Sequence, residues 1–471
     1  MNFYLEQDGS GQGKSDMQLI GTPGLAIEYT LDDRPIRCEL ATQGRSFAIG
    51  GSLFYELLAG GAKNKIGIVA NDGLVCKMAA GTNQILIASA GVAYVFDLTA
   101  GTFVALPAAT FAGLVASVGW CDGFFLALIA NSPKVQVSGA EDATSWNLID
   151  FIVNSSLIGN IKAMIVDHRE IWLFGDQQTQ PYSNDGNFPV PFDAIPGGFI
   201  EQGIIAPNSP FRLDNSVFWL GGDERGAGIF WRANGYTPVR VSNHAVEAEW
   251  RTYPTMTDAV GYTQQEGGHS FGWLYFPSAN KTWVYDAATG MWHERAFWNA
   301  ANGIYTAHRS QCHMFNFGKH LMGDWASGNI YNMSPSIYTD FENSIRSLRR
   351  SPYISTEEKW TYFSQLQIDI EAGLGPQPPL LDGNGEPRSP QLMLSWFKGG
   401  SRIQSNEYTL SFGQAGEFTM RAVKRMMGRD RNRTFQIVIT DPVPRRIVDA
   451  YLLATLHAPQ ERLGAQLRKM Q

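Results

Sequence analysis

Seven short apolar segments recur along the first two thirds of the chain at nearly even intervals. The intervals between successive segment centres are 38, 39, 47, 47, 54 and 48 residues. Repeats of this length, each holding several short strands, are typical of β-propeller blades, because one blade cannot bury its faces alone and must stack on its neighbours. The segment centres are Ala48, Leu86, Phe125, Trp172, Trp219, Trp273 and Leu321. We therefore expect an all-β fold with a six- or seven-bladed propeller, seven being favoured, and the alternative is a pair of evenly spaced β-sandwiches.

A strand–turn–strand pattern occurs twice within these repeats. The two stretches read KTWVYDAATGMWHER and VAYVFDLTAGTFVAL. When their aromatic runs are aligned, Asp286 falls on Asp97 and Gly290 falls on Gly101. Aspartate and glycine are turn residues, and runs of aromatic and β-branched residues favour strands. The match indicates that the same hairpin is used in two blades.

The composition agrees with a β-protein made in a reducing compartment. Aromatic residues make up 12 % of the 471 residues, and the chain contains 49 glycines, which suits pleated sheets joined by tight turns. The polar start has no apolar core typical of a secretory signal, and no apolar run reaches membrane-spanning length. The four cysteines lie far apart, so we expect reduced, buried thiols. These cysteines are Cys38, Cys76, Cys121 and Cys312.

The spacing of the apolar segments changes near residues 345–357, where a basic stretch is followed by Pro352. Beyond it, five or six alternating apolar segments without the propeller spacing predict a small β-sandwich. We expect four parts: an extended N-terminal arm (1–30), the propeller (31–345), a linker (346–358), and the sandwich with a C-terminal tail (359–471). Only residues 342–350 and 456–470 have a pattern that favours a helix.

Charge is distributed unevenly along the chain. The net charge is −7, yet residues 421–471 carry +7 and the other 420 residues carry −14. A basic end on an acidic body predicts a polar contact surface, for an acidic protein or for nucleic acid. The alternative is a solvated arginine cluster, or intrachain pairs to Asp430 and Asp441. The candidate contact residues are Arg421, Lys424, Arg425, Arg429, Arg431 and Arg433.

No strong enzyme or metal signature is present in the sequence. The GxSxG, HExxH, Walker A and strand-linked GxGxxG motifs do not occur. The nearest metal candidate (His308, Cys312, His313, His320) has no common zinc spacing, and neighbouring strand residues point to opposite faces. DGNGE (382–386) supplies few calcium ligands, so an exposed turn is favoured. His168 beside Glu170 has no nucleophile to activate. We therefore expect no catalytic, cofactor-binding or metal-binding residue, and tryptophans that serve mainly as core.

The order of several segments resembles one known family. The segments are NFYLEQDGSGQGKSDMQLIGTPGL (2–25), GGSLFYEL (50–57), DHREIWLFGDQQTQPYSNDG (167–186), NSVFWLGGDERGAGIFWRANGYTPVRVSNHAVE (215–247), KTWVYDAATGMWHER (281–295), GDWASGNIYNM (323–333) and SFGQAGEFTMRAVKRMMGRDRNRTFQIVITDPV (411–443). Together they are similar to the tail-hub, or nozzle, proteins of short-tailed phages, also called packaged-DNA stabilisation proteins. The likeness spans most of the chain and rests on ordered, degenerate motifs.

This resemblance implies a structural role in the virion tail, after synthesis in the cytoplasm of the host bacterium. Such proteins form a homohexameric ring below the portal and its adaptor, extend the DNA channel and help to retain packaged DNA. They also support a needle or plug and the tail fibres or spikes. DNA would pass through the lumen without sequence readout, and neither a cofactor nor a membrane is implied.

Two other classes of function remain open from the sequence. A carbohydrate- or receptor-binding propeller would expose aromatic side chains on one face of the propeller. A glycosidase would need two carboxylates about 5–10 Å apart across a pocket, and no such pair can be nominated from the sequence.

Overall fold

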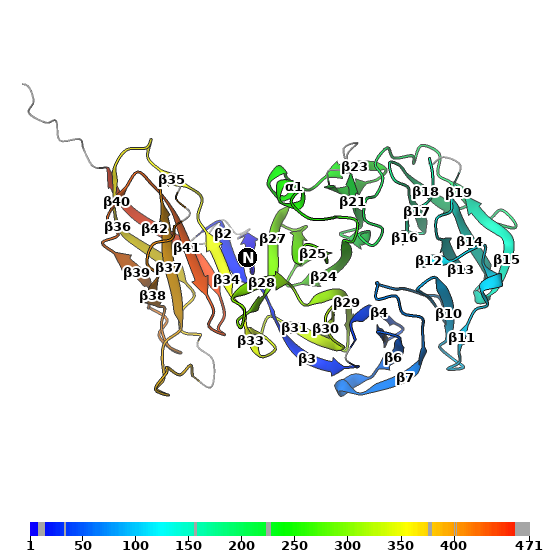
Figure 1. The fold of residues 1–471 in the computed structure, drawn as a ribbon, viewed down its shortest axis with the longest axis horizontal. Coiled ribbons are helices and arrows are strands. Elements are labelled where there is room, and N and C mark those ends of the chain that lie inside the picture. Colours follow the sequence, from blue (N-terminus) through cyan, green and yellow to red (C-terminus); the bar gives the residue numbers. More distant parts are fainter. Residues whose placement is uncertain are drawn as a thin grey trace, which may run out of the picture. The chain divides into compact units, whose positions relative to one another are not determined.

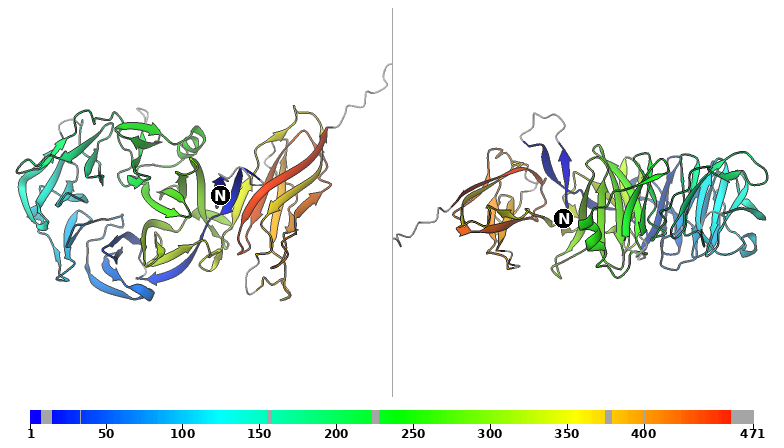
Figure 2. Two further views of the ribbon diagram at one scale, coloured as in Figure 1. Left: turned by 180° about the vertical axis from the view of Figure 1, so that it is seen from behind. Right: turned by 90° about the horizontal axis from the view of Figure 1, so that it is seen from above.

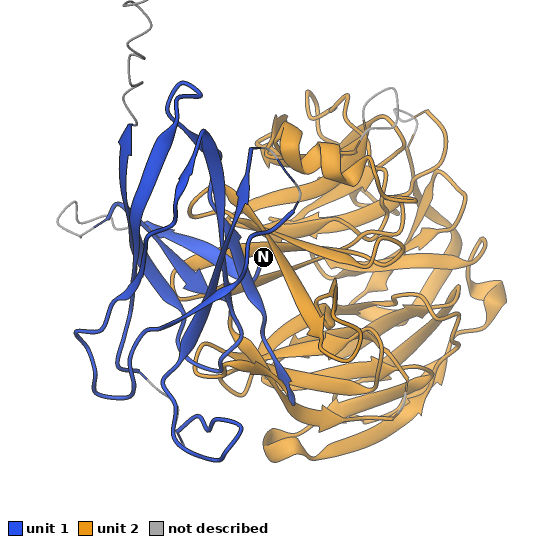
Figure 3. Cartoon of the chain, turned by 60° about the vertical axis from the view of Figure 1, so that its left-hand side comes forward, with its two compact units in different colours: residues 1–22, 342–471 blue, residues 23–341 orange. Residues whose placement is uncertain are grey.

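The computed structural model describes residues 1–7, 15–32, 34–154, 158–222, 228–374, 379–399, 401 and 403–456. These residues form two compact units, each considered by itself (Figure 3). We call residues 23–341 the propeller unit, and residues 1–22 together with 342–471 the sandwich unit. The described residues are almost entirely β-structure or loops. Their helical elements are α1 (His244–Trp250), η1 (Ala59–Gly61) and η2 (Ala108–Thr110).

The described part of the propeller unit contains seven sheets, which follow one another around a ring (Figure 1 and the left view of Figure 2). The first four sheets are antiparallel and have four strands each. Their strands are β4 (Ile36–Thr42), β5 (Arg45–Gly50), β6 (Leu53–Leu57) and β7 (Lys63–Ile68); β8 (Lys77–Ala80), β9 (Gln84–Ser89), β10 (Val92–Asp97) and β11 (Phe103–Ala105); β12 (Val115–Cys121), β13 (Phe124–Ile129), β14 (Lys134–Ala140) and β15 (Asp142–Val153); and β16 (Ala163–Asp167), β17 (Glu170–Phe174), β18 (Thr179–Asn184) and β19 (Phe192–Ala194).

The remaining three sheets follow the same plan, with additional strands at the edges of the last two. Their strands are β20 (Phe211–Leu213), β21 (Ser216–Gly222), β22 (Gly228–Asn234) and β23 (Thr237–Arg240); β24 (Val260–Glu266), β25 (His269–Phe276), β26 (Lys281–Asp286), β27 (Met291–Asn299) and β28 (Ile304–Ala307); and β29 (Ser310–Asn316), β30 (Lys319–Asp324), β31 (Asn329–Ser334), β3 (Gly24–Thr30) and β32 (Thr339–Asp340). The expected all-β fold with a propeller is therefore confirmed.

Each of the seven apolar segments read from the sequence forms the second strand of its sheet, namely β5, β9, β13, β17, β21, β25 and β30. All seven segment centres are buried. A second strand has a paired neighbour on each side, and the adjacent sheets pack against both of its faces. It therefore carries an almost continuous apolar run rather than strict alternation, which is why it was the strand visible in the sequence.

The two matching hairpins adopt the same turn. In each, the aspartate ends a strand, and its backbone carbonyl accepts a hydrogen bond from the glycine N–H, at 2.9 Å for Gly101 to Asp97 and 2.8 Å for Gly290 to Asp286. The aspartate carboxylate also accepts backbone N–H groups inside the turn. Both glycines have φ of 68°, a left-handed conformation that favours glycine. The repeat predicted from the sequence is confirmed.

The last sheet is completed by a strand from the beginning of the chain. β3 pairs antiparallel with β31, placing Leu25 opposite Met333. Beyond the strand, the N–H of Leu31 donates to the carbonyl of Gly328 at 2.7 Å. Residues 24–30 are therefore part of the propeller, and the expected extended arm over residues 1–30 is wrong for this segment.

The sandwich unit has two facing sheets built from both ends of the chain. One sheet runs in the order β1-β2-β42-β36-β39, with β40 also on β36, and the other in the order β34-β41-β37-β38, with β35 also on β41. The strands of these two sheets are β1 (Phe3–Gln7), β2 (Met17–Gly21), β34 (Ser347–Arg350), β35 (Ile354–Ser355), β36 (Thr361–Ile370), β37 (Gln391–Lys398), β38 (Tyr408–Ser411), β39 (Ala422–Arg425), β40 (Arg429–Asp430), β41 (Asn432–Ile439) and β42 (Arg446–Leu456). The short strand β33 (Asn343–Ser344) is in neither of them.

The start of the chain therefore also differs from the expected arm. β1 and β2 form a hairpin, and β2 pairs with β42 through Leu19 and Ile447. The side chain of Arg445 is buried and donates to the carbonyl oxygens of Thr22 (3.0 Å) and Ile345 (3.2 Å). It thus joins, inside the sandwich unit, the two chain segments that lead to and from the propeller.

Two local expectations are also corrected. Residues 342–350, read as favouring a helix, form β33 and β34 instead. Ser347–Arg350 pairs with Gln436–Ile439 of β41, and this pairing outweighs the local helical preference. The expected linker (346–358) consequently contains β34 and β35. Of the second segment read as helical, residues 457–470 lie outside the described residues.

The closure of the propeller can be tested at Gly328. A Cβ atom at this position would overlap the carbonyl oxygen of Asp32, which follows β3. We expect Gly328→Ala to destabilise the propeller unit by about 3 kcal/mol, because the conflict is with backbone that cannot rotate away. Limited proteolysis and denaturant unfolding of the full chain would measure the loss. Gly383→Ala is the control, since its Cβ would meet nothing within 4 Å, and equal stability of both variants would contradict the assigned closure.

Candidate partner-contact surface

The outer face of the larger sandwich sheet exposes aromatic and apolar side chains. On β36 the side chains of Phe363 and Leu366 point into the core, whereas Tyr362 is 44 % exposed. On the paired strand β42, Tyr451 is 43 % exposed and Leu453 is 58 % exposed. One face of this sheet is therefore covered by the second sheet, and the other offers tyrosine and leucine to solvent.

Two of the candidate arginines lie at one end of this face. The guanidinium carbons of Arg429 and Arg431 lie 5.3 and 5.4 Å from the centre of the Trp360 ring, which is itself 43 % exposed. Arg429 is also paired across the sheet with Tyr362. Cations at this distance are attracted to the face of an indole. The exposed tryptophan is thus in contact with two exposed arginines.

A third candidate arginine extends the basic character along the same sheet. Arg425 of β39 is exposed, pairs across the sheet with Gln365 and donates to its side-chain oxygen at 3.1 Å. The next residue, Met426, is 85 % exposed. We call Trp360, Tyr362, Arg425, Arg429, Arg431, Tyr451 and Leu453 the aromatic–arginine face. Tyrosine, tryptophan, methionine and arginine are the residues enriched in protein–protein interfaces.

The other three sequence candidates lie in different surroundings. Arg421 is exposed just before β39. Lys424 is half-buried, with its ammonium 3.6 Å from the centre of the Tyr408 ring. Arg433 is fully buried, so its place among the candidate surface contacts is not supported.

Arg433 is part of the sandwich core. Its guanidinium lies 4.3 Å from the Phe363 ring and 5.2 Å from the Trp396 ring, and donates to the carbonyl of Met427 at 2.8 Å. Asp430 lies 3.8 Å away. Burial lowers the pKa of Arg433, and the Asp430 charge opposes that shift. Of the alternatives that the sequence left open, Arg433 therefore adopts the intrachain pair with Asp430.

Asp441, the other acidic partner considered from the sequence, is engaged elsewhere. Its two carboxylate oxygens accept from Arg388 at 2.6 and 2.8 Å. It therefore does not neutralise the aromatic–arginine face. Across the units, the sandwich residues contain 19 Lys or Arg against 16 Asp or Glu, whereas the propeller residues contain 18 against 28. The basic end of the chain and its acidic body thus coincide with the two structural units.

A second candidate site is the cavity on the propeller axis. It has a volume of about 680 Å³ and is lined from the first strand of every sheet. Its wall combines polar and apolar groups, and the ionisable lining residues include Glu39 and Lys77. Burial raises the pKa of Glu39 and lowers that of Lys77. A duplex whose major groove alone is about 12 Å wide does not fit such a space, so the axis of one propeller is not a DNA channel.

The histidine and cysteine cluster considered for a metal is used in blade packing. His313 Nδ1 lies 2.6 Å from the carbonyl of Thr263, and its Nε2 lies 3.1 Å from His320. His308 Nδ1 lies 2.7 Å from the Ser310 hydroxyl. Among the described residues, no group of three or more His, Cys, Asp or Glu side chains is arranged to hold a metal ion.

The cysteines match the expectation of reduced, largely buried thiols. Three of the four are buried and Cys312 is half-buried, all in the free form. The Cys38 and Cys76 sulfurs lie 2.8 Å apart between the first two sheets. Burial raises the pKa of Cys121 to about 12 and raises that of Cys38 well above its usual value. Protonated, buried thiols are poor nucleophiles.

The His-Arg-Glu motif forms a turn between blade strands. His168 and Arg169 both have positive φ and make the two-residue connection between β16 and β17. His168 Nε2 lies 2.6 Å from the Asn215 side chain, and Arg169 donates to Asp122 at 2.6 Å. These partners sit in the equivalent turns of the two neighbouring sheets. Glu170 accepts from an indole and a tyrosine hydroxyl, so the motif links blades.

The remaining sequence candidates also have structural surroundings. Asp382 accepts the N–H groups of Asn384 and Glu386 at 2.8 and 2.9 Å, which lowers its pKa and forms the expected exposed turn. Of the tryptophans, Trp219 and Trp273 are fully buried. Trp231 is half-buried and lines a pocket that the sequence gave no reason to expect.

Two sequence profiles of one family match most of the chain. The profile described as "Bacteriophage P22 Gp10, beta-propeller" matches residues 6–338, and that described as "Bacteriophage P22 Gp10, beta-sandwich" matches residues 347–454. The chain belongs to the P22 Gp10 family. It is therefore a structural protein of a phage tail that stabilises packaged DNA, as the sequence resemblance implied.

Several solved structures have a distant likeness to this chain. The WD40 β-propeller domain of Doa1 has a TM-score of 0.41 at 9 % identity, over 66 % of this chain and 96 % of that one. The N-terminal domain of Nup159 has a TM-score of 0.41 at 9 % identity, over 71 % and 95 %. The extracellular domain of BT4673 from B. thetaiotaomicron has a TM-score of 0.44 at 12 % identity, over 86 % and 48 %. No curated protein matches the chain.

The described residues contain no helix that is both long enough and apolar enough to cross a membrane. Membership of the P22 Gp10 family places the protein in the tail of the virion.

The different roles of two neighbouring arginines give a stability prediction. We expect Arg433→Ala to cost about 3 kcal/mol of sandwich stability, because it removes a buried, stacked guanidinium and leaves Asp430 without its partner. Arg429→Ala should stay within about 0.5 kcal/mol, since its side chain is exposed. Denaturant unfolding of the full chain would measure both. A stable Arg433→Ala protein would contradict the core assignment.

The half-buried histidine His313 predicts an acid-sensitive propeller. Burial, with a smaller repulsion from His320, lowers the pKa of His313 to about 3, against about 6.5 when unfolded. Between pH 6.5 and about 3, the unfolded chain binds a proton on His313 and the folded chain does not. The stabilisation is therefore complete above pH 6.5 and is lost progressively as the pH falls towards 3, by about 1.4 kcal/mol per pH unit. His313→Gln should have a correspondingly flatter dependence of unfolding free energy on pH between 6 and 4, and an unchanged slope would contradict this origin.

Proposed function

We propose that this protein is the tail-hub subunit that forms a ring below the portal and adaptor and extends the channel for DNA. The observation that carries this proposal is the family match over both units, combined with an exposed aromatic–arginine face on the basic unit. The seven sheets act as seven blades of a rigid body from which the wall of a tube can be built. The needle or plug and the fibres or spikes attach to this ring.

The charge of the two units supports a head-to-tail ring. The basic sandwich unit of one copy is complementary to the acidic propeller unit of the next. Contacts between unlike surfaces generate a closed ring when the rotation closes, and six copies close it here. The aromatic–arginine face supplies the stacking groups and the paired charges that such an interface uses.

DNA then runs through the lumen of the ring and not through a propeller axis, whose cavity is too small. Net negative charge on the propeller unit, which we propose lines much of that lumen, disfavours tight phosphate contacts. A lumen lined by Lys and Arg would instead hold DNA by releasing counterions. An acidic lining lets the duplex slide during ejection without sequence readout.

The assembly role of the aromatic–arginine face can be tested by charge reversal. We expect Arg429→Glu with Arg431→Glu to lower incorporation into particles about tenfold, because like charges placed at an interface cost several kcal/mol. Arg433 is left intact because it belongs to the core. The matched control is Lys65→Glu with Arg251→Glu, two exposed positions of the propeller unit. Quantitative blotting of purified particles gives the readout, and normal incorporation of the Arg429/Arg431 variant would overturn the assignment of this face.

The hub role itself is tested by particles made without this protein. We expect heads that package DNA, then lose it, and carry a shortened tail by electron microscopy. Particles that keep both their DNA and a complete tube but fail to adsorb would instead assign the protein to receptor binding.

A further inference from the structure

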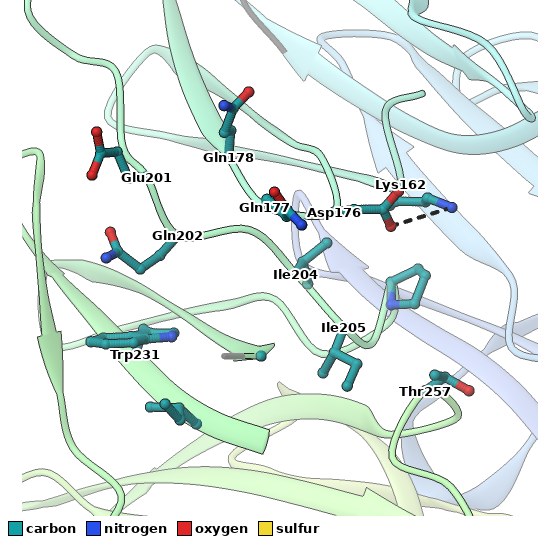
Figure 4. A pocket seen from close by; sticks show the side chains of 13 residues that line it. Lys162, Asp176, Gln177, Gln178, Glu201, Gln202, Ile204, Ile205, Trp231 and Thr257 are labelled. Atoms are coloured by element: carbon teal, nitrogen blue, oxygen red, sulfur yellow. Dashed lines mark ion pairs between the residues drawn. The ribbon is translucent and has the colours of Figure 1, made fainter. Parts of the chain in front are cut away.

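A pocket of about 1080 Å³ opens between two adjacent sheets of the propeller unit (Figure 4). Its walls come from the turn between β17 and β18, from the segment that leads to β20, and from β22. The volume is slightly above the range of about 300–1,000 Å³ that is usual for sites that hold small ligands. The family assignment and the tail-hub proposal make no use of this pocket.

The backbone around the pocket is held by hydrogen bonds within the chain. The N–H of Ile204 donates to the carbonyl of Gly175 at 3.0 Å, and the hydroxyl of Thr179 donates to the carbonyl of Gln202 at 2.7 Å. Gly203 lies so close to Asp176 that a Cβ there would overlap the Asp176 backbone. The two segments that carry the polar side chains are therefore fixed against each other, so a ligand meets a preformed wall.

The polar wall is rich in amide groups. Gln177, Gln178 and Gln202 line the pocket, and Figure 4 shows them on two neighbouring segments together with Glu201. The side-chain oxygen of Gln178 accepts the N–H of Ile158 at 3.1 Å, which leaves its NH₂ group as a donor. An amide both donates and accepts hydrogen bonds, as a hydroxyl group does. A row of such groups suits a ligand that carries many hydroxyl or acetamido groups.

The charges of the pocket disfavour an anionic ligand. Its carboxylates are Asp176 and Glu201, and Lys162 is its single cation among the lining residues. The Lys162 ammonium lies 3.4 Å from Asp176 and is already paired. Glu201 remains as an exposed negative charge, which would repel phosphate, sulfate and nucleic acid and would accept hydrogen bonds from hydroxyl groups.

The opposite wall is apolar and includes an aromatic ring. Trp231 of β22 lies across from Trp219 in the sheet, with Ile204 and Ile229 also lining the pocket. Gly221 lets the indole approach the neighbouring strand, because a Cβ there would lie 2.7 Å from Trp231 Cδ1. Figure 4 shows Trp231 below Gln202, so a ring seated between them would meet an apolar surface and an amide. The C–H face of a pyranose ring is a chemical match for an indole.

We propose that this pocket binds an uncharged or amine-bearing oligosaccharide of the bacterial surface. A sugar ring stacks on Trp231, and the three glutamines and Glu201 form hydrogen bonds with its hydroxyl or acetamido groups. The negative charge of Glu201 repels acidic saccharides. A tail hub with this pocket holds surface polysaccharide near the site of DNA entry. The inference concerns the propeller pocket alone and does not depend on the ring contacts proposed above.

The test uses the full-length protein and a defined panel of trisaccharides. Chitotriose and maltotriose are the neutral probes, a chitosan trimer is the amine-bearing probe, and a sulfated heparin trisaccharide is the acidic probe. Saturation-transfer NMR and calorimetry should show binding of at least one neutral or amine-bearing probe and none of the sulfated probe. Each probe is titrated from about 10-fold the protein concentration up to ~10 mM. If none of the three non-acidic probes binds in this range, the proposal is overturned.

Variants distinguish this pocket from any other site. Trp231→Ala and Gln202→Ala should each weaken binding about tenfold or more, as loss of a stacking ring or of paired polar groups does, whereas Trp231→Phe should stay within about threefold. Gln265→Ala, at an exposed position of β24, is the matched control and should bind normally. Because Trp231 also packs against the core shared with the preceding sheet, Gln202→Ala keeps the test valid if Trp231→Ala fails to fold. Unchanged binding by both pocket variants overturns the proposal.

Two further results separate this inference from its alternatives. Phage carrying Gln202→Ala should assemble and retain DNA normally but adsorb more slowly, so a defect in assembly would point to the tail-hub role instead. An extended peptide from another tail protein is the competing occupant. If peptides from the tail proteins bind the wild-type protein, lose affinity in Gln202→Ala and no saccharide binds, the pocket is a protein-docking site and the saccharide proposal is wrong.

Discussion

The pairing of β3 with β31 is the contact on which the propeller depends. Each of the other sheets is built from consecutive hairpins, but the last one needs a strand from the opposite end of the propeller segment. Without that strand the ring of sheets would have an unpaired edge, and its two ends would be free to part. The crowding of Gly328 against Asp32 shows how closely the joined ends approach each other.

This closure also explains the order of the units along the chain. Both ends of the propeller segment belong to one sheet, so the chain can leave and re-enter the sandwich unit through neighbouring strands. Within that unit, Arg445 holds Thr22 and Ile345 together from a buried position. The sandwich is consequently a single core made from residues at the beginning and end of the chain, and its larger sheet places β2 beside β42.

Charged and aromatic residues that lie close together in the sequence or across a sheet differ in whether their side chains are buried or exposed. Arg431 and Arg433 are two positions apart, yet one is exposed beside Trp360 and the other is buried between Phe363 and Trp396. Arg431 lies between β40 and β41, outside any strand, whereas Arg433 lies within β41. The same distinction applies to tryptophans, because Trp219 is core whereas Trp231, its partner across the sheet, borders the saccharide pocket that we propose.

The sequence by itself determined the all-β class, the seven second strands, the repeated aspartate–glycine turn and the basic end of the chain. These features are local or periodic, because a strand buried on both faces must be apolar throughout and a left-handed turn position favours glycine. Only the tertiary structure decided that β3 closes the propeller, that Arg433 is internal, and that Gln177, Gln202 and Trp231 share a pocket. These outcomes depend on pairing between distant segments, and nothing in a short stretch of sequence specifies which distant strand will satisfy its backbone groups.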